Sequence, residues 1–211
     1  MILGPLTPLI NSISDTPLNQ LIETIDFEYP WLELGESCLI LGKKSILEDH
    51  SESIPEPIRS FLKYLMLSEG CNRKEALNNL LLLVRRGEHK SPLIEARLRL
   101  ERALIFLEEG EKEKAVEEAE WAETRLSVIS KGTRHHSIGV LVRLAILNSV
   151  GDVFRALHLC GEVRRDGQHD PWAVGRTRLE AGKILAQHGR IEESLRVGWI
   201  AMCLLNGTND K

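Results

Sequence analysis

Apolar positions recur along the chain with a helical period, in runs that end at a glycine and lead into a second helix with one small-residue face. One run covers 104–107 and ends at Gly110, and similar runs end at Gly151 and Gly189. Small side chains follow each glycine at 5, 9 and 12 positions: Ala115, Ala119 and Ala122; Ala156, Cys160 and Val163; Ser194, Gly198 and Ala201. A unit used three times predicts stacked helical hairpins.

The two helices of each unit differ in their apolar pattern. In the second helix, small and apolar residues from Ala115 to Ile129 recur at i, i+4 and i+7, and glutamates occupy the opposite face: Glu117, Glu118, Glu120 and Glu123. We expect these glutamates to be solvated. The first helix, over 98–107, is apolar in nearly every direction. Such a helix needs cover on several sides, which is the position of an inner helix in an array.

Capping signals set the expected boundaries of the helices. Ser91 before Pro92, and Asp152 after Gly151, are typical of residues that begin a helix. The resulting map has helices at about 17–26 and 30–48, then hairpins at about 57–86, 92–129, 137–165 and 171–206. We therefore predict an all-α fold, an α-solenoid of antiparallel helical hairpins with about ten helices and no sheet.

The chain divides into three expected regions. Residues 1–56 form an N-terminal helical cap, 57–206 form the repeat domain, and 207–211 form a flexible tail. The segment 50–57 contains two prolines and is the best candidate for a linker.

Composition adds a charge gradient to this picture. The 211 residues are 43% hydrophobic and carry a formal net charge of -4. Residues 1–70 hold 11 acids and 4 bases, giving -7, whereas residues 131–211 hold 8 acids and 12 bases, giving +4. This asymmetry orients an acidic partner toward the C-terminal part, although uneven solvated surface accounts for it equally.

Cysteine usage and hydropathy indicate a cytoplasmic protein. The four cysteines form no Cys-x-x-Cys pair and are expected to be reduced: Cys38, Cys71, Cys160 and Cys203. No apolar stretch reaches the roughly 20 residues of a membrane span, and the start of the chain lacks a basic leader.

The repeated unit resembles the tetratricopeptide repeat. The resemblance lies in Leu-x-x-Gly-Glu-x-x-x-Ala at 107–115, in Gly151 with Ala156, in Gly189 with Ser194, and in Trp-x-x-Leu-Gly at 31–35. It implies helix–turn–helix repeats in a right-handed superhelix whose inner groove holds a peptide or helix of a partner. The repeat glycines are 40, 41 and 38 residues apart, whereas that family's unit is about 34 residues, so other α-solenoids with longer units remain open.

The resemblance implies that one side of each first helix lines the groove. The implied protein-binding residues are Arg97, Leu100 and Leu104, then Leu141, Ala145 and Asn148, then Arg176, Leu179 and Lys183. Aliphatic anchors mixed with bases suit an amphipathic helix or an extended acidic peptide. The alternative is that the leucines belong to the core and the bases are solvated.

Residue patterns for catalysis or metal binding do not point to a site. His135 and His136 fall in a polar connector and are expected to be solvent-exposed, and no His or Cys spacing offers four zinc ligands. The sequence contains no Gly-x-Ser-x-Gly, His-Glu-x-x-His or dinucleotide-binding pattern. We therefore expect no enzyme, no cofactor and no metal.

The functional expectation is a non-enzymatic scaffold or adaptor for protein–protein interaction. One alternative is a dedicated chaperone for a secreted or assembling subunit. Another is binding of single-stranded RNA by helical repeats, which the acidic N-terminal third and the glutamates of 108–123 disfavour. A fourth is a structural segment of a larger regulator or an oligomer of this chain, because terminal repeats need polar caps.

Overall fold

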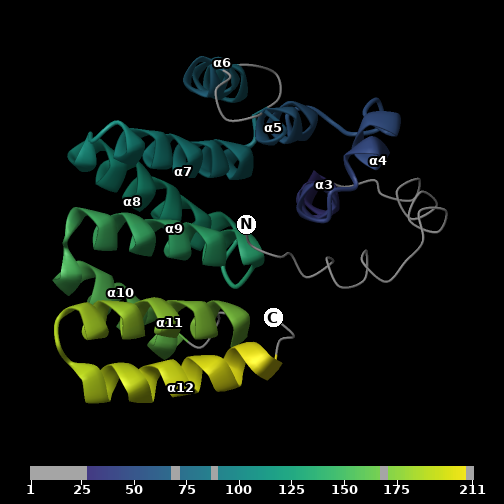
Figure 1. Cartoon of the computed structure of the whole chain (residues 1–211). Helices are drawn as coiled ribbons and strands as arrows, with labels where there is room; N and C mark the ends of the chain where they lie inside the picture. The colour runs from purple at the N-terminus through teal and green to yellow at the C-terminus, as the bar shows by residue number, and fades with distance from the viewer. Residues whose placement is uncertain (1–27, 68–71, 87–89, 167–170, 208–211) are drawn as a thin grey trace. The chain divides into compact units, whose positions relative to one another are not determined.

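The computed structural model describes residues 28–67, 72–86, 90–166 and 171–207, and these ranges contain α-helices and no strand (Figure 1). The helices are α3 (Glu28–Ile40), α4 (Lys44–Asp49), α5 (Ile58–Leu65), α6 (Arg73–Arg86), α7 (Pro92–Glu108), α8 (Lys112–Ile129), α9 (Arg134–Val150), α10 (Val153–Asp166), α11 (Pro171–Gln187) and α12 (Ile191–Gly207). The all-α prediction is confirmed for the described residues. The helix expected at 17–26 lies outside them.

The chain forms two compact units, residues 1–98 and 99–211, whose division falls inside α7. The boundary expected between residues 56 and 57 lies within the first unit, which includes helices on both sides of it. In that unit α3 packs against α4 and α5, and α5 packs against α6. Its core is aromatic and aliphatic: Trp31, Leu32, Leu34, Ile58, Phe61 and Leu62.

One predicted helix of the first unit is interrupted. The span expected as a single helix over 30–48 ends at Ile40 and restarts at Lys44. Between them Gly42 takes a φ of 73°, a left-handed conformation that glycine adopts without the steric cost of a Cβ. The sequence map joined the apolar residues on either side of the Gly-Lys-Lys-Ser segment at 42–45 into one helix.

The glycine that ends each repeated run closes its helix in the same way. Gly110, Gly151 and Gly189 have φ values of 80°, 85° and 74°. Each donates its amide to the carbonyl three residues earlier, and the next residue donates to the carbonyl five residues earlier at 2.8 to 2.9 Å. This is the Schellman closure of a helix. Gly42 has the same pair of hydrogen bonds, so the turn occurs four times in the described residues.

Capping side chains confirm two of the predicted helix starts. The Asp152 carboxylate accepts the backbone N–H of Arg155 at 3.1 Å, and the Ser91 hydroxyl accepts that of Ile94 at 3.3 Å. Each oxygen satisfies a backbone donor that has no partner within its own helix. The repeated turn thus ends one helix and begins the next within three residues.

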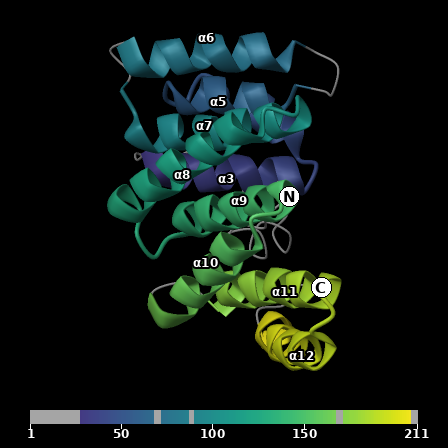
Figure 2. The ribbon, with the colours of Figure 1, turned by 90° about the vertical axis from the view of Figure 1, so that its left-hand side faces the viewer.

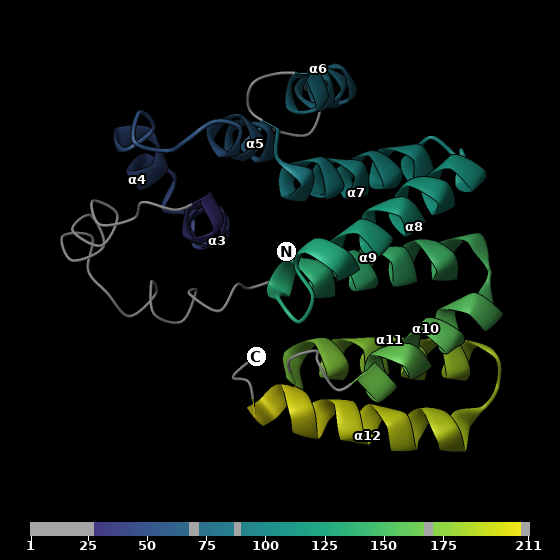
Figure 3. The ribbon, with the colours of Figure 1, turned by 180° about the vertical axis from the view of Figure 1, so that it is seen from behind.

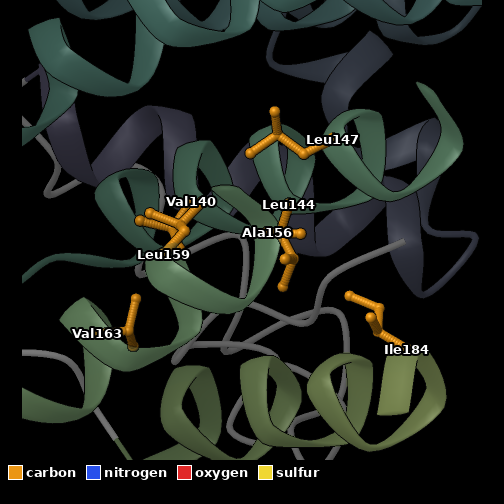
Figure 4. Close-up of a cluster of buried hydrophobic side chains, with 7 residues drawn as sticks. All are labelled: Val140, Leu144, Leu147, Ala156, Leu159, Val163 and Ile184. Carbon is orange, nitrogen blue, oxygen red and sulfur yellow. The ribbon is translucent and has the colours of Figure 1, made fainter. Parts of the chain in front are cut away.

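Helices of the second unit share continuous cores. Figures 1 and 3, from opposite sides, show α9 and α11 side by side with α10 against one face of the pair, and Figure 2 shows α10 at a level between them. One core draws on all three helices (Figure 4): Val140, Leu144, Leu147, Ala156, Leu159, Val163 and Ile184. Helix α8 packs on α9, and α12 packs on α11.

The small-residue faces predicted from the sequence are packing surfaces. Ala115, Ala119 and Ala122 of α8 are fully buried, as are Ala156 of α10 and Ala201 of α12. Small residues also occur on the facing first helices. A Cβ at Gly139 of α9 would lie 2.9 Å from Leu126 Cδ1, and the Ser194 hydroxyl of α12 donates to the Gly182 carbonyl of α11 at 2.8 Å. Small side chains let these helix backbones approach closely.

The repeated turn gives a stability prediction at Gly151. Replacement by Ala is expected to lower the free energy of unfolding by about 1 kcal/mol, because an L-residue is strained in the left-handed region. Asn tolerates this region better than Ala, so Gly151→Asn is expected to cost less than Gly151→Ala. Urea unfolding followed by circular dichroism measures both variants, and equal stability of wild type and Gly151→Ala would contradict the prediction.

Candidate protein-interaction site

Helix α9 presents one stripe of side chains away from its core. Leu141 and Asn148 are half-buried and Ala145 is exposed, at a spacing of i, i+4 and i+7. Their neighbours Leu144 and Leu147 are buried in the core shared with α10 and α11. Because this spacing places the three residues on one helical face, the surface predicted for α9 lies outside the core.

Helix α11 presents a second stripe of this kind. Arg176 and Leu179 are half-buried and Lys183 is exposed. The ammonium of Lys183 lies 2.6 Å from Glu180 Oε1, so a carboxylate also belongs to this stripe. Because α9 and α11 are in contact, the two stripes come from neighbouring helices. We call the six residues the α9–α11 surface: Leu141, Ala145, Asn148, Arg176, Leu179 and Lys183.

Two residues predicted for the groove are structural instead. Arg97 is buried, donates two hydrogen bonds to the Glu36 carboxylate at 2.5 and 3.2 Å, and lies over the Phe61 ring. Leu100 is a fully buried core residue. The helical period alone did not distinguish core from surface here, because α7 is apolar on nearly all sides. Leu104 is half-buried and packs on a core that includes Ala103.

The acidic face of α8 binds arginines of neighbouring helices, which corrects the expectation of simple solvation. Glu118 accepts Arg99 at 3.3 Å and Arg102 at 2.5 Å, both from α7. Glu120 lies 2.8 Å from both Arg143 of α9 and Arg155 of α10. The side chains of these pairs are partly buried, where screening by salt is weaker than at an open surface. These carboxylates therefore link helices of the second unit.

Glu123 of α8 is the buried member of this series. Its carboxylate accepts Arg143 Nη1 at 2.7 Å, and Oε1 lies 3.5 Å from His136 Nε2. Burial raises the pKa of Glu123, but its hydrogen bonds with His136 and Arg143 and their positive charge outweigh burial, so the pKa lies below its ordinary value of 4.5. The carboxylate is therefore held in its charged form between α8 and α9.

His135 and His136 are both buried, contrary to the sequence expectation of exposed loop residues. Helix α9 begins at Arg134, three residues before the predicted start, and carries both histidines into the fold in its first turn. The Arg134 guanidinium lies 3.3 Å from the centroid of the Trp172 ring on α11. This cation–π contact joins the first turns of α9 and α11. The predicted start was placed beside the apolar run that begins at Ile138, so the first helical turn before it was not recognised.

Two kinds of reactive group are relevant in the described residues: a metal-binding cluster and an activated cysteine. No group of three or more His, Cys, Asp or Glu side chains there is placed to hold a metal ion. Burial, followed by the charge of Glu180, raises the pKa of the Cys160 thiol to about 12. Because the thiolate is the reactive form, this cysteine is a poor nucleophile.

A small hollow lies in the first unit. Its volume is about 240 Å³, below the roughly 300 to 1,000 Å³ of typical small-molecule sites. Apolar side chains, two bases, one acid and one serine line it: Leu47, Glu48, Ser51, Ile54, Arg59, Leu62, Lys63 and Met66. The Arg59 side chain is already bound to Glu56 at 2.8 Å.

Comparison with models of known families, with curated proteins and with solved structures finds no significant match to this chain. The helices in the described ranges are all too short or too polar to cross a bilayer.

The Glu123 cluster generates a pH prediction. Because folding lowers the pKa of Glu123, its stabilising contribution is full above about pH 4.5 and is lost as the pH falls through the folded-state value. Glu123→Gln is expected to lose about 2 kcal/mol of unfolding free energy at neutral pH and to show a shallower decline in acid.

Glu117→Gln is the matched control, since Glu117 is exposed on the same helix. It is expected to change stability by less than about 0.5 kcal/mol at every pH. Urea titrations at a series of pH values compare the three proteins. Identical acid sensitivity of wild type and Glu123→Gln would refute the assignment.

Proposed function

We propose that this chain is a non-enzymatic scaffold or adaptor that binds a peptide or helix of a partner protein on the α9–α11 surface. In this proposal the helices form tetratricopeptide-like repeats, with α9 and α11 as the inner helices of two successive units. The turns at Gly110, Gly151 and Gly189 share the same backbone geometry, which supports such a repeat.

The single observation that carries the proposal is the pairing of two outward stripes on helices in contact. Leu141 and Leu179 supply aliphatic surface, and Asn148 and Arg176 supply groups that form hydrogen bonds. Since buried side chains of α9, α10 and α11 form one core behind the stripes, the surface is held on packed helices. Rigid presentation lowers the entropic cost of binding.

Charge favours an acidic partner. Residues 131–211 hold 12 bases against 8 acids, and on the stripe of α11 Arg176 remains as net positive charge beside the Lys183–Glu180 pair. A basic surface steers an acidic segment toward it and raises the rate of association. An amphipathic helix with acidic residues beside its apolar anchors fits this combination.

Placing a negative charge on the α9–α11 surface tests the proposal. Leu141→Asp and Arg176→Glu are each expected to weaken partner capture at least tenfold, because they remove an anchor and a steering charge. Affinity purification with quantitative mass spectrometry compares each variant with wild type. Val128→Asp is the control, since Val128 is a 72% exposed apolar residue on α8.

Partners retained by Val128→Asp and lost by both surface variants support the proposal. Circular dichroism verifies that each variant keeps its helical content. Capture of the same proteins in the same amounts by correctly folded Leu141→Asp and Arg176→Glu would exclude the α9–α11 surface as the binding site.

A further inference from the structure

Helix α12 carries an exposed apolar stripe beside the face that packs on α11. Ile191, Leu195, Trp199 and Met202 are 54%, 69%, 67% and 53% exposed. Their spacing of 4, 4 and 3 residues places them on one helical face. Ala201 of the same helix is fully buried, and Ser194 donates to the Gly182 carbonyl of α11, so α12 packs on α11 through a face that adjoins the stripe.

The sequence repeat shows what this stripe corresponds to in α8 and α10. Its four residues lie 2, 6, 10 and 13 positions after Gly189. At 6 positions after the equivalent glycines, Val116 of α8 and Leu157 of α10 both pack against the core formed by α9, α10 and α11. At 2 positions, Val153 of α10 packs against the same core.

Of the three other equivalents in α8, Lys112 at 2 positions is exposed, and the two at 10 and 13 positions bind later helices. Glu120, at 10 positions, lies 2.8 Å from Arg143 of α9 and from Arg155 of α10. Glu123, at 13 positions, accepts Arg143 and lies beside His136. Three of the four stripe positions are therefore used by α8 for contact with later helices, and two of them pack against the shared core in α10, whereas α12 presents exposed apolar side chains at all four.

We propose that two copies of this chain associate through this stripe, with the two α12 helices packed antiparallel across a twofold axis. A twofold interface uses the same patch on both copies, which suits a stripe that is apolar along its whole length. With the axis near residue 197, Leu195 of one copy faces Trp199 of the other, and Ile191 faces the region of Met202.

Charge placement selects the antiparallel arrangement. The charged residues of α12 lie in its first half: Glu192, Glu193 and Arg196. Residues 197–207 carry no charge. A parallel pair would bring Glu192, which flanks the stripe, near its own counterpart, and like charges that face each other across an interface are destabilising. An antiparallel pair places the charged half of one helix along the uncharged half of the other.

The size of the stripe is appropriate for a modest dimer. Its four side chains expose on the order of 500 Å² per copy, which is large for an apolar patch on a monomer. Two copies bury roughly 1,000 Å², close to the lower bound of specific interfaces. We therefore expect a reversible dimer that depends on concentration in the micromolar range.

Sedimentation velocity of the full chain over a range of concentrations tests the proposal. The wild type is expected to shift from monomer to dimer, and Leu195→Glu and Trp199→Glu are each expected to weaken the dimer at least tenfold. Val128→Glu is the matched control, since it places the same charge at an exposed apolar residue of α8. It is expected to dimerise as the wild type does, and circular dichroism verifies the fold of every variant.

Spin labels at the two ends of α12 test the orientation, with the exposed Cys203 replaced by Ser. In the antiparallel pair a label at Arg190 of one copy lies near a label at Asn206 of the other, while two Arg190 labels are displaced by about 20 Å along the axis. Close Arg190 labels would overturn this arrangement.

A wild type that stays monomeric at all concentrations would overturn the dimer, as would unchanged dimerisation of Leu195→Glu and Trp199→Glu. Leu141→Asp lies on the α9–α11 surface and is expected to leave dimerisation intact. Failure of partner binding and failure of the dimer are thus separate results.

Discussion

Burial of α9 on several sides is the constraint on which the second unit depends. Nine of its residues are buried, including both histidines of its first turn and Leu144 and Leu147 farther along. A helix of this kind has no stable place at an open surface. Helices α8, α10 and α11 all contact it, and the space available to them is set by small residues such as Gly139. The remaining stripe of α9 is left to face outward.

Charged side chains reinforce this packing by joining specific helices. The glutamates of α8 bind arginines from α7, α9 and α10, and the most buried of them, Glu123, is held between Arg143 and His136. A buried carboxylate is stable only when paired and hydrogen-bonded. These pairs favour one relative placement of the helices, because each carboxylate needs its own partner at the correct height along α8.

The second unit offers two surfaces with different chemistry. The α9–α11 surface combines leucines with Asn148, Arg176 and Lys183, whereas the stripe on α12 is apolar and centres on Leu195 and Trp199. A mixed surface is suited to selective binding of a charged segment, and a purely apolar one to association that excludes water. Separate surfaces would allow one chain to bind a partner and a second copy at the same time.

Local signals in the sequence determined the helices and their ends. Gly110, Gly151 and Gly189 close helices because only glycine enters the left-handed region at no steric cost, and Asp152 caps the helix that follows. The small faces of α8, α10 and α12 followed from the helical period. The turns, the cap and the small-residue faces each depend on residues close together in the chain, so the residue types and their spacing were enough to predict them.

Tertiary structure alone decided which apolar and charged residues became core. Arg97 and Leu100 have the pattern of a binding face, yet Arg97 is buried because Glu36, 61 residues away in the chain, supplies its counter-charge. His136 is buried because α9 begins one turn early and meets Glu123 of α8. Helical spacing gives the direction of a side chain around its own axis, but the neighbour in that direction comes from a distant segment.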